Sequence, residues 1–166
     1  YSAIHVVQIP GALDESRLRS SIAAVLETRG LTNLTLNRKK ASYGYEGGAA
    51  VCEVKILPGQ PDPRPAIHAE MERQLNMPFV TTQRFNPFRF FAAPAGDAFF
   101  LGLTYFHPAA DAESVVLLLK DLAEAYLRKV SPQDLAALDV YPDSRSHLLD
   151  RHVRVLTRRL ARLATA

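Results

Sequence analysis

Cysteine is almost absent from this chain of 166 residues, which contains only Cys52. An internal disulfide is therefore excluded, and the near-absence of cysteine is typical of proteins from a reducing compartment, so we expect a cytoplasmic location. Cys52 lies in a predicted strand, where we expect a small buried residue rather than a nucleophile. The sequence also lacks a secretory signal and any apolar run of the roughly 20 residues that a bilayer span needs.

Several motifs that carry chemistry are missing as well. There is no GxGxxG, no P-loop and no GxSxG, so dinucleotide, phosphate-loop and serine-hydrolase functions have no support. The five histidines have no cysteine or carboxylate at ligand-like spacing, and His147 and His152 are five residues apart, which is poor spacing for one helix face. We predict no metal site.

Acidic residues are scarce in one region, the C-terminal tail. Residues 145–166 contain six arginines and one aspartate, a local charge of +5 within a net charge of +3. The rest of the chain carries 14 Lys and Arg against 16 Asp and Glu, a charge of −2, which argues against a nucleic-acid-binding core. With 48% apolar and 22% charged residues, a chain of this length forms a folded domain with its own core.

The first half of the chain alternates predicted strands and helices. Apolar or alternating runs predict strands at 3–9, 31–38 and 49–57, and a Tyr- and Gly-rich loop lies at 42–48. Asp14 is a predicted N-cap for a helix that ends at Gly30. A second helix is predicted over 66–75, with Ile67, Met71 and Leu75 on one face.

The second half begins with a predicted hairpin. Its strands are 84–93 and 98–107, around the turn residues 94–97. A helix follows, in which Val115, Leu119, Leu122 and Tyr126 recur at helical spacing.

Residues 131–166 are expected to form a helical extension of a lobe that covers 1–130. A short helix is predicted through Leu138, and a last helix, 147–163, has one leucine-rich stripe and one arginine stripe. Two alternatives stay open for this last helix. It packs on the body with a solvated arginine face, or it makes a peripheral contact with an acidic membrane surface or an acidic partner.

One histidine stands at a structural boundary. His107 follows an apolar run that ends the second hairpin strand, and Pro108 forces the residue before it into extended geometry. Asp111, four residues further on, precedes a helical pattern and can cap it. An imidazole, with a reference pKa of about 6.5, can accept and return a proton near neutral pH.

This stretch resembles a known motif. Residues 106–112, FHPAADA, resemble the HHxxxDG motif of the coenzyme A-dependent acyltransferase superfamily, which includes chloramphenicol acetyltransferase, the condensation domains of nonribosomal peptide synthetases and wax ester synthases. The opening strand, the Pro-Gly-x-Leu-Asp connection and the Pro78-Phe79 pair also resemble elements of condensation-type domains. Phe106 stands where the motif has its first histidine, and Ala112 where it has glycine.

The resemblance implies a fold and an activity. The fold is α+β, a two-layer α/β sandwich with a mixed, largely antiparallel sheet and helices packed on one face. His107 would be the general base that deprotonates an alcohol or amine acceptor. The acyl donor would be a thioester of coenzyme A or of a carrier-protein phosphopantetheine, and no cofactor would be tightly bound.

The resemblance also suggests roles for neighbouring residues. Asp111 would orient the motif loop through a salt bridge, for which Arg89 is a candidate partner, while Phe106 and Ala112 would border the substrate channel. The residues themselves allow plainer interpretations, in which His107 is a core histidine bonded to a backbone carbonyl and Asp111 is only an N-cap.

The match covers one lobe, approximately 3–129, and the sequence contains no DFGWG-like motif of a second lobe. An active enzyme would therefore need a second lobe or another subunit to complete its channel. The alternative hypothesis is a non-catalytic lobe that binds a carrier protein, a partner subunit or a membrane surface.

Overall fold

A four-stranded mixed sheet forms the centre of the computed structural model, which describes residues 1–37, 39–40, 42–51 and 53–135. Its strand order is β1 (Ser2–Pro10), β6 (Ala98–Phe106), β5 (Phe88–Ala95) and β4 (Val54–Ile56). The β1–β6 and β5–β6 pairs are antiparallel and the β4–β5 pair is parallel. A separate antiparallel hairpin joins β2 (Leu34–Asn37) to β3 (Ser42–Tyr45).

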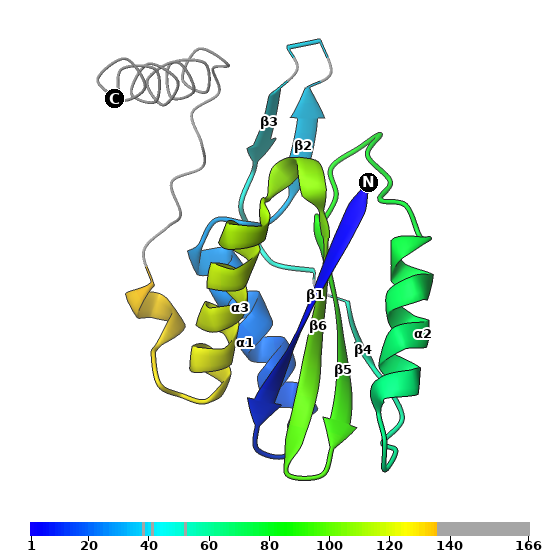
Figure 1. Ribbon diagram of the computed structural model, residues 1–166. Coiled ribbons are helices and arrows are strands. Elements are labelled where there is room, and N and C mark those ends of the chain that lie inside the picture. Colours follow the sequence, from blue (N-terminus) through cyan, green and yellow to red (C-terminus); the bar gives the residue numbers. More distant parts are fainter. Residues whose placement is uncertain (38, 41, 52, 136–166) are drawn as a thin grey trace, which may run out of the picture.

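Helices α1 (Glu15–Thr28) and α3 (Ala112–Tyr126) cover one face of this sheet (Figure 1). The Asp14 carboxylate caps α1 by accepting a hydrogen bond from the Arg17 amide at 2.9 Å, and Gly30, with φ +70°, follows the end of this helix. The four predicted apolar positions of α1 are fully buried: Leu18, Ile22, Val25 and Leu26. The four predicted positions of α3 are buried too: Val115, Leu119, Leu122 and Tyr126.

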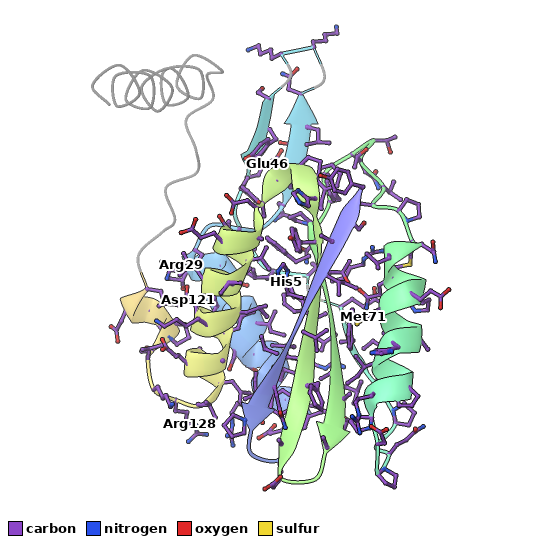
Figure 2. The ribbon with its side chains drawn as sticks, in the orientation of Figure 1. His5, Arg29, Glu46, Met71, Asp121 and Arg128 are labelled. Atoms are coloured by element: carbon purple, nitrogen blue, oxygen red, sulfur yellow. The ribbon has the colours of Figure 1, made fainter. Side chains whose placement is uncertain are left out.

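Polar contacts of two α3 side chains, Tyr126 and Asp121, fix this helix on the sheet. The Tyr126 hydroxyl accepts a hydrogen bond from the Asp14 amide and donates one to the Ala12 carbonyl, both at 2.9 Å. Arg29, which follows α1, forms an ion pair with Asp121 of α3, and Figure 2 shows the two side chains facing one another between the helices. The start and the end of α1 are therefore both tied to α3.

Helix α2 (Arg64–Leu75) lies on the opposite face. There Ile67 packs with Leu57, Phe91 and Ala93, and Figure 1 shows α2 and α3 on opposite sides of the strands. The predicted α+β class with a mixed, largely antiparallel sheet is confirmed. The expectation of two layers, with the helices packed on one face, is wrong because α2 covers the second face. Side chains that alternate along β5 and β6 are apolar on both faces, so each face needs a cover.

Three boundary predictions need correction. The predicted loop at 42–48 contains strand β3, which has the sequence Ser-Tyr-Gly-Tyr and pairs with β2 in antiparallel fashion. The strand predicted over 49–57 is only Val54–Ile56, because its pairing with β5 extends no further. The predicted hairpin is confirmed, with Gly96 at φ +68° in its turn.

The predicted extension begins within the described residues. A short 3₁₀ helix, η2 (Pro132–Asp134), follows α3, and Leu135 packs against the α1/α3 core. Cys52, the end of the short helix predicted through Leu138 and the basic helix predicted for 147–163 lie outside the described residues. Across the described ranges, no helix has the length and apolar character required to cross a membrane.

Candidate active site

The backbone presents His107 where strand β6 stops. The Phe106 amide donates to the Pro87 carbonyl at 2.9 Å, and the His107 amide donates to the Tyr1 carbonyl at 3.3 Å. His107 then opens a short 3₁₀ helix, η1 (His107–Ala109), whose turn is closed by a bond from the Ala110 amide to the His107 carbonyl at 3.3 Å. The predicted position of His107, after a strand and before a helix, is confirmed.

The His107 ring is half-buried between aromatic rings. Its centroid lies 4.8 Å from the Tyr1 ring and 5.7 Å from the Tyr105 ring. None of the described residues forms a hydrogen bond with either ring nitrogen. The alternative of a core histidine satisfied by a backbone carbonyl therefore does not describe this ring, whose nitrogens can meet a bound group.

A small hollow of about 200 Å³ lies beside this ring. Its lining consists of Tyr43, residues 107–111 and Ser114. Strand β3 supplies Tyr43. The sequence did not predict this residue as part of the site, because residues 42–48 were expected to form a loop. The alternation of tyrosines at 43 and 45 is the signal that could have indicated a strand. The hollow is smaller than the roughly 300–1,000 Å³ of typical ligand pockets.

Asp111 is the N-cap of α3, as predicted. Its Oδ1 accepts a hydrogen bond from the Ser114 amide at 2.8 Å. This bond lowers the pKa of the Asp111 carboxyl below its ordinary value, and the nearby His107 contributes in the same direction. The cap fixes where α3 begins, and thereby the far end of the turn that starts at His107.

The predicted salt bridge between Asp111 and Arg89 is not formed. Arg89 lies on the sheet face that α2 covers, where its Nη2 donates to the backbone carbonyls of Gln74 at 3.0 Å and Met77 at 2.7 Å. Its guanidinium carbon is 4.2 Å from the centre of the Phe79 ring. The alternation of side chains along β5 places Arg89 on one face of the sheet, whereas α3 and its cap are on the other.

Phe106 and Ala112 flank the motif without lining the hollow. Phe106 packs edge-on against Phe79 and Phe85, with ring centroids 5.9 Å and 5.5 Å apart. Ala112 is exposed at the first position of α3 and has no positive φ, so its backbone does not require glycine. Their predicted place beside a substrate channel stays a prediction.

No metal site is evident in the part of the chain that the structure describes. No group of three or more His, Cys, Asp or Glu side chains gathers there in a way that could hold an ion.

Comparison with solved structures identifies the fold. The tallysomycin biosynthesis protein TlmII superposes with a TM-score of 0.66 at 20% identity, over 98% of this chain and 42% of that chain. The starter condensation domain of the rhizomide synthetase RzmA gives a TM-score of 0.62 at 20% identity, over 94% and 38%. The complex of the X-domain and OxyB from teicoplanin biosynthesis gives 0.58 at 20% identity, over 85% and 30%.

The chain therefore has the fold of the N-terminal lobe of condensation domains, and it spans less than half the length of the structures it matches. Neither a protein-family model nor a curated protein matches the sequence.

Proposed function

We propose that this chain is the N-terminal lobe of a condensation-type acyltransferase, with His107 as the general base. The observation that carries this proposal is the His107 ring itself. It is half-buried beside a hollow, without a hydrogen bond from the described residues, at the end of β6 in a fold of the condensation type.

The reaction would proceed through a tetrahedral intermediate. A ring nitrogen of His107 accepts the proton of the acceptor hydroxyl or amine while the acceptor oxygen or nitrogen attacks the thioester carbonyl. When the intermediate collapses, the carbon–sulfur bond breaks, the thiolate leaves and the imidazolium returns the proton to it. General base catalysis of this kind contributes about 10² to 10⁴ in rate.

The remaining wall of the site would come from a second lobe or another subunit. A hollow of about 200 Å³ is too small for an acyl chain, a thioester arm and an acceptor together. The donor would be an acyl thioester of coenzyme A or of a phosphopantetheine carrier, and the acceptor an alcohol or an amine. Residues that stabilise the oxyanion would then lie partly on the opposite wall.

The test compares two histidine variants in the complete assembly. His107→Ala should reduce acyl transfer by at least about 10²-fold while circular dichroism and the unfolding midpoint stay unchanged. His68→Ala, which alters an exposed histidine of α2, should retain full turnover. Undiminished transfer by His107→Ala would contradict the proposal.

A non-catalytic lobe is the second candidate function, and one observation favours it. Phe106 fills the position of the first motif histidine and is packed into an aromatic cluster. Among the neighbours, an X-domain was solved as a complex with OxyB. Such a lobe would bind a carrier protein, a partner subunit or, through 147–163, an acidic membrane surface. Transfer activity in the complete assembly that depends on His107 would exclude it.

A further inference from the structure

Arg89 is an unusual residue for its position in the sheet. It is half-buried on β5, and its neighbour across the strands, Thr104, is fully buried. No carboxylate among the described residues lies within ion-pair distance of its guanidinium. Burial and the nearby Arg73 lower the pKa of Arg89 and outweigh the more distant Glu53 and Glu70, which raise it. A partly buried cation with no carboxylate in direct contact must be stabilised by other polar groups, so the groups that Arg89 contacts are informative.

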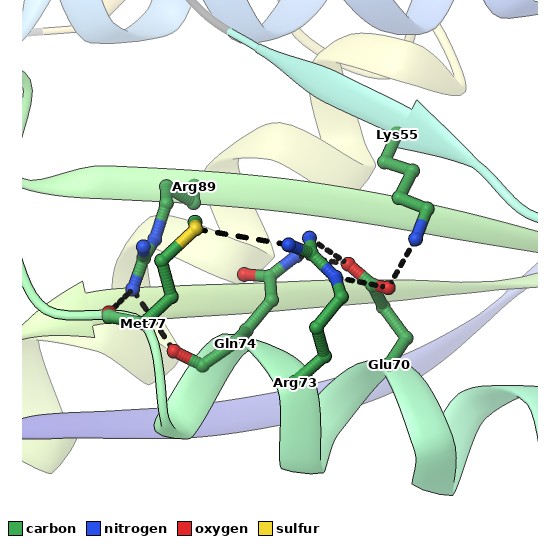
Figure 3. A network of polar contacts seen from close by, with 6 residues as sticks. All are labelled: Lys55, Glu70, Arg73, Gln74, Met77 and Arg89. Atoms are coloured by element: carbon green, nitrogen blue, oxygen red, sulfur yellow. Dashed lines mark hydrogen bonds and ion pairs between the residues drawn. The ribbon is translucent and has the colours of Figure 1, made fainter.

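Those groups belong to the end of α2 and the turn after it. The Gln74 carbonyl is one of the last carbonyls of α2, and the Met77 carbonyl lies two residues beyond the helix. The Gln74 carbonyl also accepts a bond from the Met77 amide at 3.2 Å. Carbonyls at a helix C-terminus carry partial negative charge and lack the usual i+4 partner, so a cation is favourable there. Figure 3 shows Arg89 directed at this end of α2, whereas Lys55 and Arg73 bind Glu70 about one turn nearer the start of the helix. Arg73 also donates to the Met77 Sδ at 3.7 Å.

The same turn reaches the motif through aromatic contacts. Phe79 lies over the Arg89 guanidinium at 4.2 Å, and its ring is edge-on to Phe106 with centroids 5.9 Å apart. Phe85 completes the aromatic cluster, 6.1 Å from Phe79 and 5.5 Å from Phe106. Phe106 is covalently joined to His107. An unbroken series of contacts therefore leads from Arg89 through Phe79 and Phe106 to the proposed general base.

We propose that Arg89 is a positioning residue: it holds the turn of residues 76–79 against the sheet, so that Phe79 fixes Phe106 and thereby the direction of the His107 ring. This inference rests on the proposed function of His107 for its catalytic consequence, but its structural part does not. A cation–π contact and two charge-assisted hydrogen bonds act on one short segment, and that segment is the support of the aromatic cluster.

The first test uses the NMR signal of the His107 Cε1–Hε1 group in the 166-residue chain, assigned by its loss in His107→Ala. Arg89→Met should shift or broaden this signal. Lys55→Met is the matched control, since it removes a cation from the same network without touching the turn; it should leave the signal in place. A folded Arg89→Met with an unmoved His107 signal would overturn the proposal.

Phe79→Leu keeps the test decisive if Arg89→Met fails to fold. This substitution breaks the aromatic link while the two Arg89 hydrogen bonds to Gln74 and Met77 remain. It should shift the same His107 signal, and an unmoved signal in a folded Phe79→Leu would equally overturn the proposal.

The catalytic part is measured separately in the complete assembly. Misplacing a catalytic group by about 1 Å can cost about 10²-fold in rate, so we expect a fall of at least about tenfold in kcat for Phe79→Leu, with KM for the thioester within about twofold. The same fall is expected for Arg89→Met. A shifted His107 signal with unchanged kcat in Arg89→Met would reject Arg89 as a positioning residue for catalysis. Full activity of His107→Ala would instead reject the proposed function and leave the NMR result standing.

Discussion

The two faces of the central sheet are packed by different means. On the α1/α3 face, twenty buried residues of the described part of the chain form one continuous apolar core. On the α2 face, four buried apolar side chains cluster among the described residues, namely Leu57, Ile67, Phe91 and Ala93. The polar side chains of Glu70, Gln74 and Thr104 are buried with them.

The two faces therefore contribute differently: one mainly stabilises the fold, and the other mainly fixes where particular side chains lie. Apolar burial contributes about 25 cal/mol per Å² without regard to direction, so the α1/α3 face supplies most of the stability. Hydrogen bonds and ion pairs contribute little net free energy but require particular partners. The α2 face supports the aromatic cluster next to His107. Its polar contacts therefore fix the relative positions of α2, the turn after it and the sheet. Substitutions on each face can test this division.

The largest effects are expected from two neighbouring residues of β6 that point to opposite faces. Leu101 is fully buried in the α1/α3 core, and Leu101→Ala should destabilise the chain by about 3 kcal/mol by leaving a cavity. Gly102→Ala should cost about 2 kcal/mol for the opposite reason, because its Cβ would lie 2.1 Å from the buried Phe91 ring. Urea unfolding measures both free energies.

A double variant tests whether shape decides the Gly102 effect. Phe91→Leu makes room for the new methyl group, so Gly102→Ala combined with Phe91→Leu should be less destabilised than the sum of the two single variants. Strict additivity, or a neutral Gly102→Ala, would show that the α2 face is loosely packed. It could then not fix the positions of side chains as argued above.

The next effect concerns the polar network of the α2 face. Burial alone would raise the pKa of the Glu70 carboxyl, but hydrogen bonds from Arg73, Lys55 and Gln74 outweigh burial and lower it to about 2. The ordinary value is 4.5, so the stability that Glu70 contributes is present above about pH 4.5 and is lost as the pH falls toward about 2.

Glu70→Gln should therefore be less stable than the wild type by about 1–2 kcal/mol at pH 7, since Lys55 and Arg73 are half-exposed and solvent screens them. The difference should shrink as the pH falls below about 4.5, in urea unfolding at constant ionic strength. Glu72→Gln, an exposed change on the same helix, should show no such dependence. A difference that stays constant down to pH 2.5 would mean that the ion pairs of Glu70 contribute nothing.

Local signals in the sequence predicted one face better than the other. The apolar spacing of α1 and α3, the caps at Asp14 and Asp111, and the end of β6 at His107 are all encoded within a few residues, and the structure confirms them. Short-range patterns are therefore sufficient to predict the α1/α3 face and the position of the candidate base.

The α2 face depends on contacts between distant segments, which local patterns do not contain. The sequence predicted Ile67, Met71 and Leu75 as the apolar face of α2, but Leu75 is 46% exposed, and Glu70 and Gln74 are buried instead. The burial of the Glu70 carboxylate is compensated by Lys55, Arg73 and the Gln74 side-chain amide, which all donate to it. The partners of Arg89 and the strand β3 that brings Tyr43 to the hollow were missed for the same reason.

The smallest expected effect lies at the start of α3, where capping and charge can be separated. Asp111→Ala should destabilise the chain by about 1 kcal/mol in urea unfolding, because the Ser114 amide loses its acceptor. Asp111→Asn should retain nearly all of this stability, since asparagine caps helices about as well as aspartate.

The Asp111→Asn variant would also lack the negative charge near His107, so its acyl transfer in the complete assembly tests the role of that charge. If the aspartate only orients the motif, activity should follow stability, with the asparagine variant near the wild type and the alanine variant below it. A stable Asp111→Asn with strongly reduced transfer would instead assign Asp111 an electrostatic role toward the imidazolium. In that case the α1/α3 face would take part in the chemistry as well as in the stability of the lobe.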